Sequence, residues 1–256
     1  MLVTLTTAIL LLAPPQASDV LLLKPAKVMR HLHKAVKAND QKQIDRAVLA
    51  LVVMGERGRH NLRRQIKRYR SPVFSHVLSA ISQMEPRLRL IAAPLLRSKD
   101  PNRRIQGAQA LNGSSLALLK KSYAGEKALD VKLALLASIS ESDEKGSTEF
   151  LVSTLSATES RLRIQALAGL LLRRERSVLN VVHTLLGDSD FEVRASAIRF
   201  LSVLGNRNSV AFMVKRAEAE QDETVLGAIW SALESLTGES FGGDLKAWQR
   251  WLNTET

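Results

Sequence analysis

One short segment, residues 188–204, most constrains what this chain can fold into, because it is the clearest copy of a unit repeated along the sequence. The segment begins within a turn at residues 187–190. The Ser and Asp side chains of this turn can accept hydrogen bonds from the free amides of a helix start. Apolar residues then recur at the 3.6-residue period of a helix. Gly205 and Asn206, which tolerate the left-handed conformation, end it. The segment therefore predicts a helix, a tight turn, a second helix and a stop.

The unit recurs with a period close to 31 residues, and a residue pair at one fixed position marks each copy. The first members of five such pairs lie 28, 31, 31 and 32 residues apart. The pairs are Arg103-Arg104, Val131-Lys132, Leu162-Arg163, Val193-Arg194 and Val225-Leu226. An acidic residue stands three positions before four of the pairs, and Ala128 takes that place once. One amphipathic helix pair cannot bury its apolar stripe alone, so stacked copies are needed for a stable core.

The sequence LLGDSDFEVRASAIRFLSVLG, residues 185–205, resembles a HEAT repeat of the short bacterial type. The matching positions are Leu185, Leu186, Asp188, Asp190, Val193, Arg194, Ala197, Leu201, Leu204 and Gly205. The resemblance covers residues 86–236 well, and it implies that the turn Asp and the helix Arg bridge neighbouring repeats. It assigns structural roles to Asp188, Asp190, Val193, Arg194, Arg163 and Lys132. Three copies depart from the pattern, since Leu226 lacks the basic group, Lys132 replaces Arg, and Arg103 replaces an apolar residue.

Together the repeats predict an all-α fold, a right-handed α-solenoid (superhelix) of about seven antiparallel helix pairs with a short C-terminal capping helix. Apolar content of 45% with only 4% aromatic residues suits a helical stack packed with Leu and Ala. The predicted domains are a signal peptide (1–18), basic N-terminal helical repeats (19–84), HEAT-like repeats (85–236) and a Trp-containing cap (237–256). The repeat helices are expected at 86–97, 101–111, 114–124, 127–139, 148–156, 159–173, 176–187, 190–204, 207–219 and 222–236. A polar turn at 141–147 is the best candidate for a flexible loop.

The C-terminal segment differs from the repeats and predicts a cap. Trp248 and Trp251 are three residues apart and share one face of a short helix. Two Trp side chains suit the shielding of a terminal apolar surface, because each covers a large apolar area. A Trp-lined binding site is the alternative.

The N-terminal run from Leu2 to Ala13 is apolar and uncharged, and a Pro pair and small residues follow it. This pattern is typical of a signal peptide, and the run is too short to span a bilayer as a helix. No Lys or Arg precedes the run, so an apolar first helix or an unstructured end is the alternative. We expect an exported protein, periplasmic or secreted, with no transmembrane segment in the mature chain; a cytoplasmic location is the alternative.

Positive charge is concentrated in the N-terminal third of the chain. The formal net charge is +12, and residues 24–104 hold 20 Lys or Arg against 5 Asp or Glu. Helical periodicity over residues 57–70 places Leu62, Ile66 and Tyr69 opposite a basic face. The residues of this candidate partner-binding face are Arg57, Arg59, Arg63, Arg64, Lys67, Arg68 and Arg70. Such a face attracts acidic partners; a solvated face, an anionic lipid surface and nucleic acid are the other interpretations.

No residue pattern in the sequence specifies a reaction. The chain has no Cys, which excludes disulfides, thiolate metal sites and a thiol nucleophile. His31 and His33 are two residues apart, whereas a two-His metal site on a helix prefers a spacing of four. The sequence also lacks a phosphate loop, a dinucleotide glycine pattern and G-x-S-x-G. We therefore predict no catalytic residue, no metal and no cofactor.

The predicted function is a HEAT-repeat scaffold or adaptor, not an enzyme, that binds a protein partner through its curved surface. The basic N-terminal third would attract an acidic partner. The first alternative is a nucleic-acid-binding HEAT-like protein, similar to the HEAT-like DNA glycosylases but without a recognisable active site. A HEAT-like subunit of a bilin lyase is the lesser alternative, since the sequence offers no specific sign of a cofactor cleft.

Overall fold

The structure is a computed structural model that describes residues 24–68, 73–82 and 89–254. This described part is helical and contains no strand, which confirms the predicted all-α class. The chain divides into two compact units, Met1–Ser115 (unit 1) and Leu116–Thr256 (unit 2). The division falls inside the segment 85–236 that we predicted as repeats. The predicted signal peptide lies outside the described residues.

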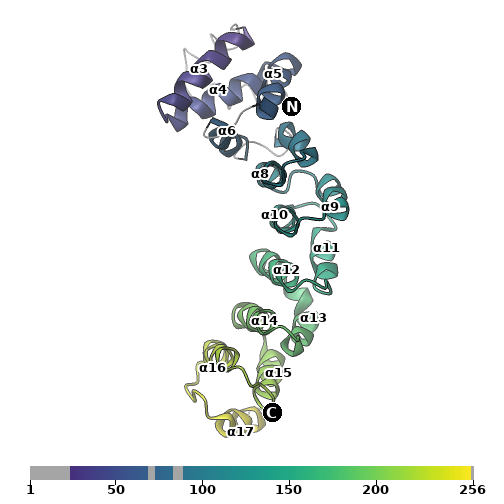
Figure 1. Ribbon diagram of the computed structural model, residues 1–256. Helices are drawn as coiled ribbons and strands as arrows, with labels where there is room; N and C mark the ends of the chain where they lie inside the picture. The colour runs from purple at the N-terminus through teal and green to yellow at the C-terminus, as the bar shows by residue number, and fades with distance from the viewer. Residues whose placement is uncertain (1–23, 69–72, 83–88, 255–256) are drawn as a thin grey trace. The chain divides into compact units, whose positions relative to one another are not determined.

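Unit 1 consists of helices that pack on one another, most extensively the two N-terminal helices and the last two elements (Figure 1). Its elements are α3 (Pro25–Lys37), α4 (Gln41–Val53), α5 (Glu56–Arg68), α6 (Val73–Ser82), the 3-10 helix η1 (Leu90–Arg97) and α8 (Pro101–Leu111). The second helices α4, α6 and α8 contact one another in turn. The hydrophobic core of unit 1 includes Leu32 of α3, Leu51 of α4 and Leu62 of α5, all of which are fully buried. Asp40 caps α4, because its carboxylate accepts the N–H of Gln43 at 3.0 Å.

One predicted helix of unit 1 has a different geometry. Within the segment 86–97, which we predicted as a helix, the structure has the 3-10 helix η1, and Pro94 lies inside it. Pro has no N–H to donate to an α-helical ladder, so a tighter and irregular turn replaces the regular helix. The following helix, α8, starts at Pro101 and ends at Leu111, as predicted.

Unit 2 consists of helix pairs stacked in two layers (Figure 1). The first helices are α9 (Leu116–Gly125), α11 (Ser147–Thr154), α13 (Leu179–Thr184) and α15 (Arg207–Ala217). The second helices are α10 (Leu129–Ser140), α12 (Ser160–Leu172), α14 (Phe191–Leu204) and α16 (Glu223–Thr237). The second helices pack directly on one another, and α17 (Leu245–Thr254) packs on α15. This arrangement confirms the predicted stack of antiparallel helix pairs in unit 2.

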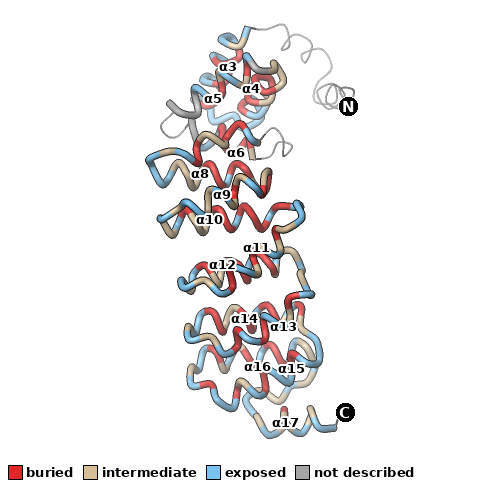
Figure 2. Tube along the Cα trace, turned by 90° about the vertical axis from the view of Figure 1, so that its right-hand side faces the viewer, coloured by how far each residue is buried: buried red, intermediate tan, exposed pale blue. Residues whose placement is uncertain are grey.

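The repeated residue pairs of unit 2 occupy equivalent positions in the second helices. The first member of each pair is buried, and so is the residue four positions later. These residues are Val131, Leu162, Val193 and Val225, followed by Leu135, Ala166, Ala197 and Ile229. Figure 2 shows buried residues gathered along the helices where the layers meet, with exposed residues at the outer turns. The 31-residue period therefore sets which face of each helix enters the core.

Three local predictions differ from the structure. Residues 176–187 form not one helix but the 3-10 helix η2 (Arg176–Val178), α13 and the 3-10 helix η3 (Leu185–Gly187). Gly205 ends α14 in extended rather than left-handed backbone, with φ −63° and ψ 171°, because Asn206 immediately starts α15 as its N-terminal cap. The turn at 141–147 is held by hydrogen bonds, and its Ser142 is only 1% exposed.

Candidate interaction surfaces and repeat joints

An Arg at the second position of the repeated pair closes the turn of its own repeat. Nη1 of Arg163 donates to the carbonyl oxygens six and five residues earlier, at 2.8 and 2.9 Å. Arg194 makes the same pair of bonds at 3.0 and 3.3 Å, and Arg104 of unit 1 makes them at 2.9 and 3.1 Å. The guanidinium therefore satisfies carbonyl groups that the turn leaves without a helical partner.

The same guanidinium groups also reach the next repeat. Nη2 of Arg163 donates to Oδ1 of Asp188 at 2.7 Å. Arg194 donates through Nε and Nη2 to the two carboxylate oxygens of Glu220, both at 2.8 Å. Each acceptor lies two residues before the residue that caps the following helix, Asp190 or Asp222. Both bridges link consecutive repeats, as the sequence resemblance implies for the turn acid and the helix Arg.

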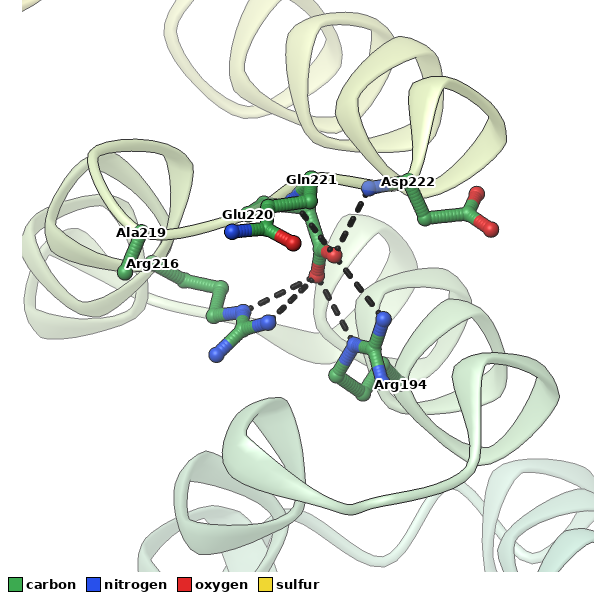
Figure 3. A pocket seen from close by; sticks show the side chains of 6 residues that line it. All are labelled: Arg194, Arg216, Ala219, Glu220, Gln221 and Asp222. Atoms are coloured by element: carbon green, nitrogen blue, oxygen red, sulfur yellow. Dashed lines mark hydrogen bonds and ion pairs between the residues drawn. The ribbon is translucent and has the colours of Figure 1, made fainter.

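Glu220 is the most fully engaged carboxylate among the residues that the structure describes (Figure 3). Arg216 also donates to it, through Nε at 2.9 Å and Nη2 at 2.8 Å, and the N–H groups of Gln221 and Asp222 add bonds at 3.0 and 3.1 Å. Its side chain is 1% exposed. Burial alone would raise the pKa of Glu220, but the bonds from Arg194, from the backbone and from Arg216 lower it to about 2.

The residues around Glu220 line a surface pocket of about 380 Å³. The guanidinium groups of Arg194 and Arg216 both point at the Glu220 carboxylate within it (Figure 3). The carboxylate thus fills the anion site that these two cations form. We interpret the pocket as a joint between repeats, because its charged groups already bind one another.

The joint between α10 and α12 lacks both members of this bridge. The residue two positions before the cap Glu159 is Ala157, and the helix residue is Lys132 in place of Arg. The Lys132 ammonium lies over the ring of Tyr123, 5.3 Å from its centroid. At this joint the turn acid and the helix Arg are therefore both absent.

Asp190 and Asp222, the other acids of these two turns, act as helix caps. Asp190 accepts the N–H groups of Glu192 at 2.9 Å and Val193 at 3.4 Å. A hydrogen bond from Ser160, together with these backbone bonds, lowers the pKa of Asp190. Asp222 accepts the N–H of Val225 at 3.0 Å. These bonds give Asp190 and Asp222 a structural role at the starts of α14 and α16.

Exposed cations gather on two helices of unit 1. Arg57 and Arg64 of the predicted basic face are exposed, whereas Arg59 and Arg63 are half-buried and have contacts of their own. The side chains of Lys67 and Arg68, and all of Arg70, lie outside the described residues. Helix α3 carries a second set of exposed cations, Lys27, Arg30, Lys34 and Lys37. Among the described residues, exposed cations therefore lie on α3 as well as on α5.

The comparison with known families agrees with this geometry. Residues 148–234 match the family model that describes HEAT repeats. Residues 148–234 are therefore HEAT repeats. The matched segment runs from α11 into α16, and it contains both Arg–carboxylate bridges. The chain matches none of the curated proteins with which it was compared.

The last HEAT repeat is followed by α17 and its two Trp residues. Trp248 is fully buried, and its indole Nε1–H donates to the carbonyl of Gly242 at 3.0 Å. The rings of Phe241 and Trp251 meet it edge-on, with centroids 4.9 and 6.4 Å away. Arg207 of α15 lies over Trp251, 5.6 Å from the ring centroid. A fully buried Trp248 has no surface to offer a ligand, so the geometry favours the shielding of α15.

Sequence reasoning missed several residues that hold the HEAT repeats together. Glu220 could have been found, because it stands 32 residues after Asp188 and at the same place before a helix cap. Arg173 carries no motif, yet its Nη1 donates to the carbonyl oxygens of Ser140 and Ser142 at 3.2 and 2.6 Å. This second link joins the ends of α12 and α10 and shows only in three dimensions.

Histidines and acids do not form a metal site in the part of the chain that the structure describes. No group of three or more His, Asp or Glu residues is placed there to hold an ion. His183 is buried, lies 2.9 Å from Ser209 Oγ through Nε2, and stacks on Phe212 with ring centroids 4.3 Å apart. None of the described helices has the length and apolar character needed to cross a bilayer.

Proposed function

We propose that this HEAT-repeat protein is a non-enzymatic scaffold that binds a protein partner, and that basic unit 1 attracts an acidic one. The observation that carries the proposal is the exposed cations of α3 and α5. Residues 105–256, by comparison, hold 17 Lys or Arg against 19 Asp or Glu. A positive field concentrated on unit 1 raises the rate at which acidic partners arrive, and it favours encounters through that unit.

The stacked repeats supply the second part of the proposed function. The layer of second helices in unit 2 is joined by buried Arg–carboxylate bridges, which hold neighbouring repeats in register. Its outer surface exposes Leu172, which is 62% exposed, and Val203, which is 52% exposed, 31 residues apart in adjacent helices. These two side chains offer a protein partner apolar contacts at the same position of consecutive repeats.

Nucleic acid is the competing partner class, and it is an outcome of the test. The described exposed residues of α3 and α5 include no Phe, Tyr or Trp side chain on which a base could stack, and their only exposed rings are the imidazoles of His31, His33 and His60. Duplex contacts through phosphates alone would be strongly salt-dependent and independent of sequence.

The proposal is tested by quantitative capture from a nuclease-treated extract of the native host. The wild-type protein is compared with Arg57→Glu/Arg64→Glu, with a reversal of two α3 cations, Lys27→Glu/Arg30→Glu, and with a control in unit 2. Lys121→Glu/Lys145→Glu is the matched control, since it changes the net charge equally at exposed positions. We expect at least one unit 1 variant to lose the captured acidic proteins and the control to keep them. Equal capture by all four proteins, or recovery of nucleic acid alone without nuclease, would contradict the proposal.

A further inference from the structure

We infer that the row Lys27, Arg30, Lys34 and Lys37 on α3 is a docking surface for an acidic helix of the protein partner. The inference rests on the proposed function and names the surface and the chemistry of the segment it binds. The four residues recur at the i, i+3, i+7 and i+10 positions of one helix, and all four are exposed. They lie on a different helix from the basic face expected at residues 57–70.

The large apolar side chains of α3 pack against the rest of unit 1. Val28, Met29, Leu32, Ala35 and Val36 are all buried, and they fix α3 against the rest of unit 1. The opposite side of the helix therefore has one defined orientation toward solvent. A fixed orientation matters for recognition, because the four cations keep one spacing without the entropy loss of ordering a loop.

The cations of the row have no ion pair with the residues that the structure describes. Helix α3 itself contains no acidic residue. The two nearest acids in the sequence have other partners: Asp40 caps α4, and Asp45 accepts a bond of 2.7 Å from Gln41 Nε2. The charge of the row is thus open to a partner.

The row also opposes the stability of its own helix. Lys34 and Lys37 lie in the last turn, where cations interact favourably with the helix dipole. Lys27 lies in the first turn, where the dipole disfavours cations, and neighbouring members of the row repel one another at i+3 and i+4 spacing. Helix stability does not explain two cations in this half, whereas an acidic partner would relieve both effects.

The shape of the row favours an acidic helix over the other anionic partners. Successive cations are about 5 Å apart along the axis and the row is about 15 Å long, from the 1.5 Å rise per residue. Carboxylates at the same i, i+3, i+7 and i+10 positions of a second helix repeat this spacing. Helix α3 exposes no large apolar side chain to enter a lipid surface and no Phe, Tyr or Trp ring to stack on a base; its exposed rings are the imidazoles of His31 and His33.

The test uses two helical peptides of identical composition, each with four Glu in an Ala/Gln background. One carries the glutamates at i, i+3, i+7 and i+10, and the other divides them between opposite faces of the helix. Fluorescence anisotropy at about 50 mM salt measures their binding to the full-length protein, because a Debye length above 10 Å preserves exposed pairs. We expect the wild-type protein to bind the aligned peptide about fivefold more tightly than the divided one.

Lys27→Glu/Arg30→Glu should abolish this preference, while its melting temperature stays equal to or above that of the wild-type protein, since acids favour a helix N-terminus. Arg57→Glu/Arg64→Glu, with the same charge change on α5, should keep the preference. Equal binding of both peptides, loss of preference in both variants, or tighter binding of a duplex DNA probe would overturn the inference. Capture lost only in the α5 variant would overturn it and leave the proposed function intact, whereas capture unchanged in every variant would overturn the proposed function itself.

Discussion

Replacing Glu220 with Gln should destabilise the joint between α14 and α16 more than any other neutralisation of one carboxylate in unit 2. The substitution keeps the shape of a side chain that is 1% exposed but removes the charge that faces Arg194 and Arg216. A pKa of about 2 in the folded protein, against an ordinary 4.5, corresponds to about 3 kcal/mol. Screening by solvent near the pocket reduces the expected loss to about 2 kcal/mol.

Urea unfolding followed by circular dichroism measures this loss, and Glu141→Gln, at an exposed position, is the matched control. The carboxyl pKa of Glu220 is lower in the folded than in the unfolded chain, so its contribution is complete above about pH 5. It should shrink as the pH falls from 4.5 toward 2, and the stability curves of wild type and Glu220→Gln should converge there. A loss no larger than that of Glu141→Gln, or a difference that does not change with pH, would refute this reasoning.

Three further predictions concern single positions in unit 2. Asp188→Glu should stabilise the protein by about 1 kcal/mol in urea unfolding, because the longer side chain can reach the buried Nε of Arg163 that has no partner, as Glu220 reaches Arg194. His183→Gln should reduce the loss of stability between pH 7 and pH 5, since burial lowers the pKa of His183 and the unfolded chain takes up the proton first. Trp248→Ala should cost about 3 kcal/mol by thermal unfolding.

Much of the fold could be predicted because the repeat pattern records packing directly. Val193 and Ala197 lie one helical turn apart and are both buried, and the equivalent residues are buried in the other copies of the pattern in unit 2. Pro94 shows the limit, because the apolar pattern of its segment is helical while the missing N–H changes the backbone geometry. Gly205 shows another, since a residue that tolerates left-handed backbone also adopts the extended form.

The joints could be predicted only in part. The Arg163–Asp188 bridge follows from the repeat pattern, because each member stands at a fixed place in its own repeat. The contribution of Arg216 could not be predicted, since it lies outside the repeated pair and reaches Glu220 only through the turn of α15 into α16. The basic residues of α3 can be read from the sequence. Only the structure shows that they share an exposed face, because that depends on which residues of the helix are buried.

The most direct test of electrostatic recruitment by unit 1 is the association rate of the captured acidic partner. Stopped-flow mixing at about 50 and about 200 mM salt separates that rate from dissociation. We predict that the wild-type association rate falls steeply with salt. The association rate of Lys27→Glu/Arg30→Glu should be low already at about 50 mM salt and should change little at about 200 mM. Its dissociation rate should differ little from that of the wild-type protein. A wild-type association rate that does not depend on salt, or a variant that differs from the wild-type protein only in dissociation, would contradict the recruitment of an acidic partner by unit 1.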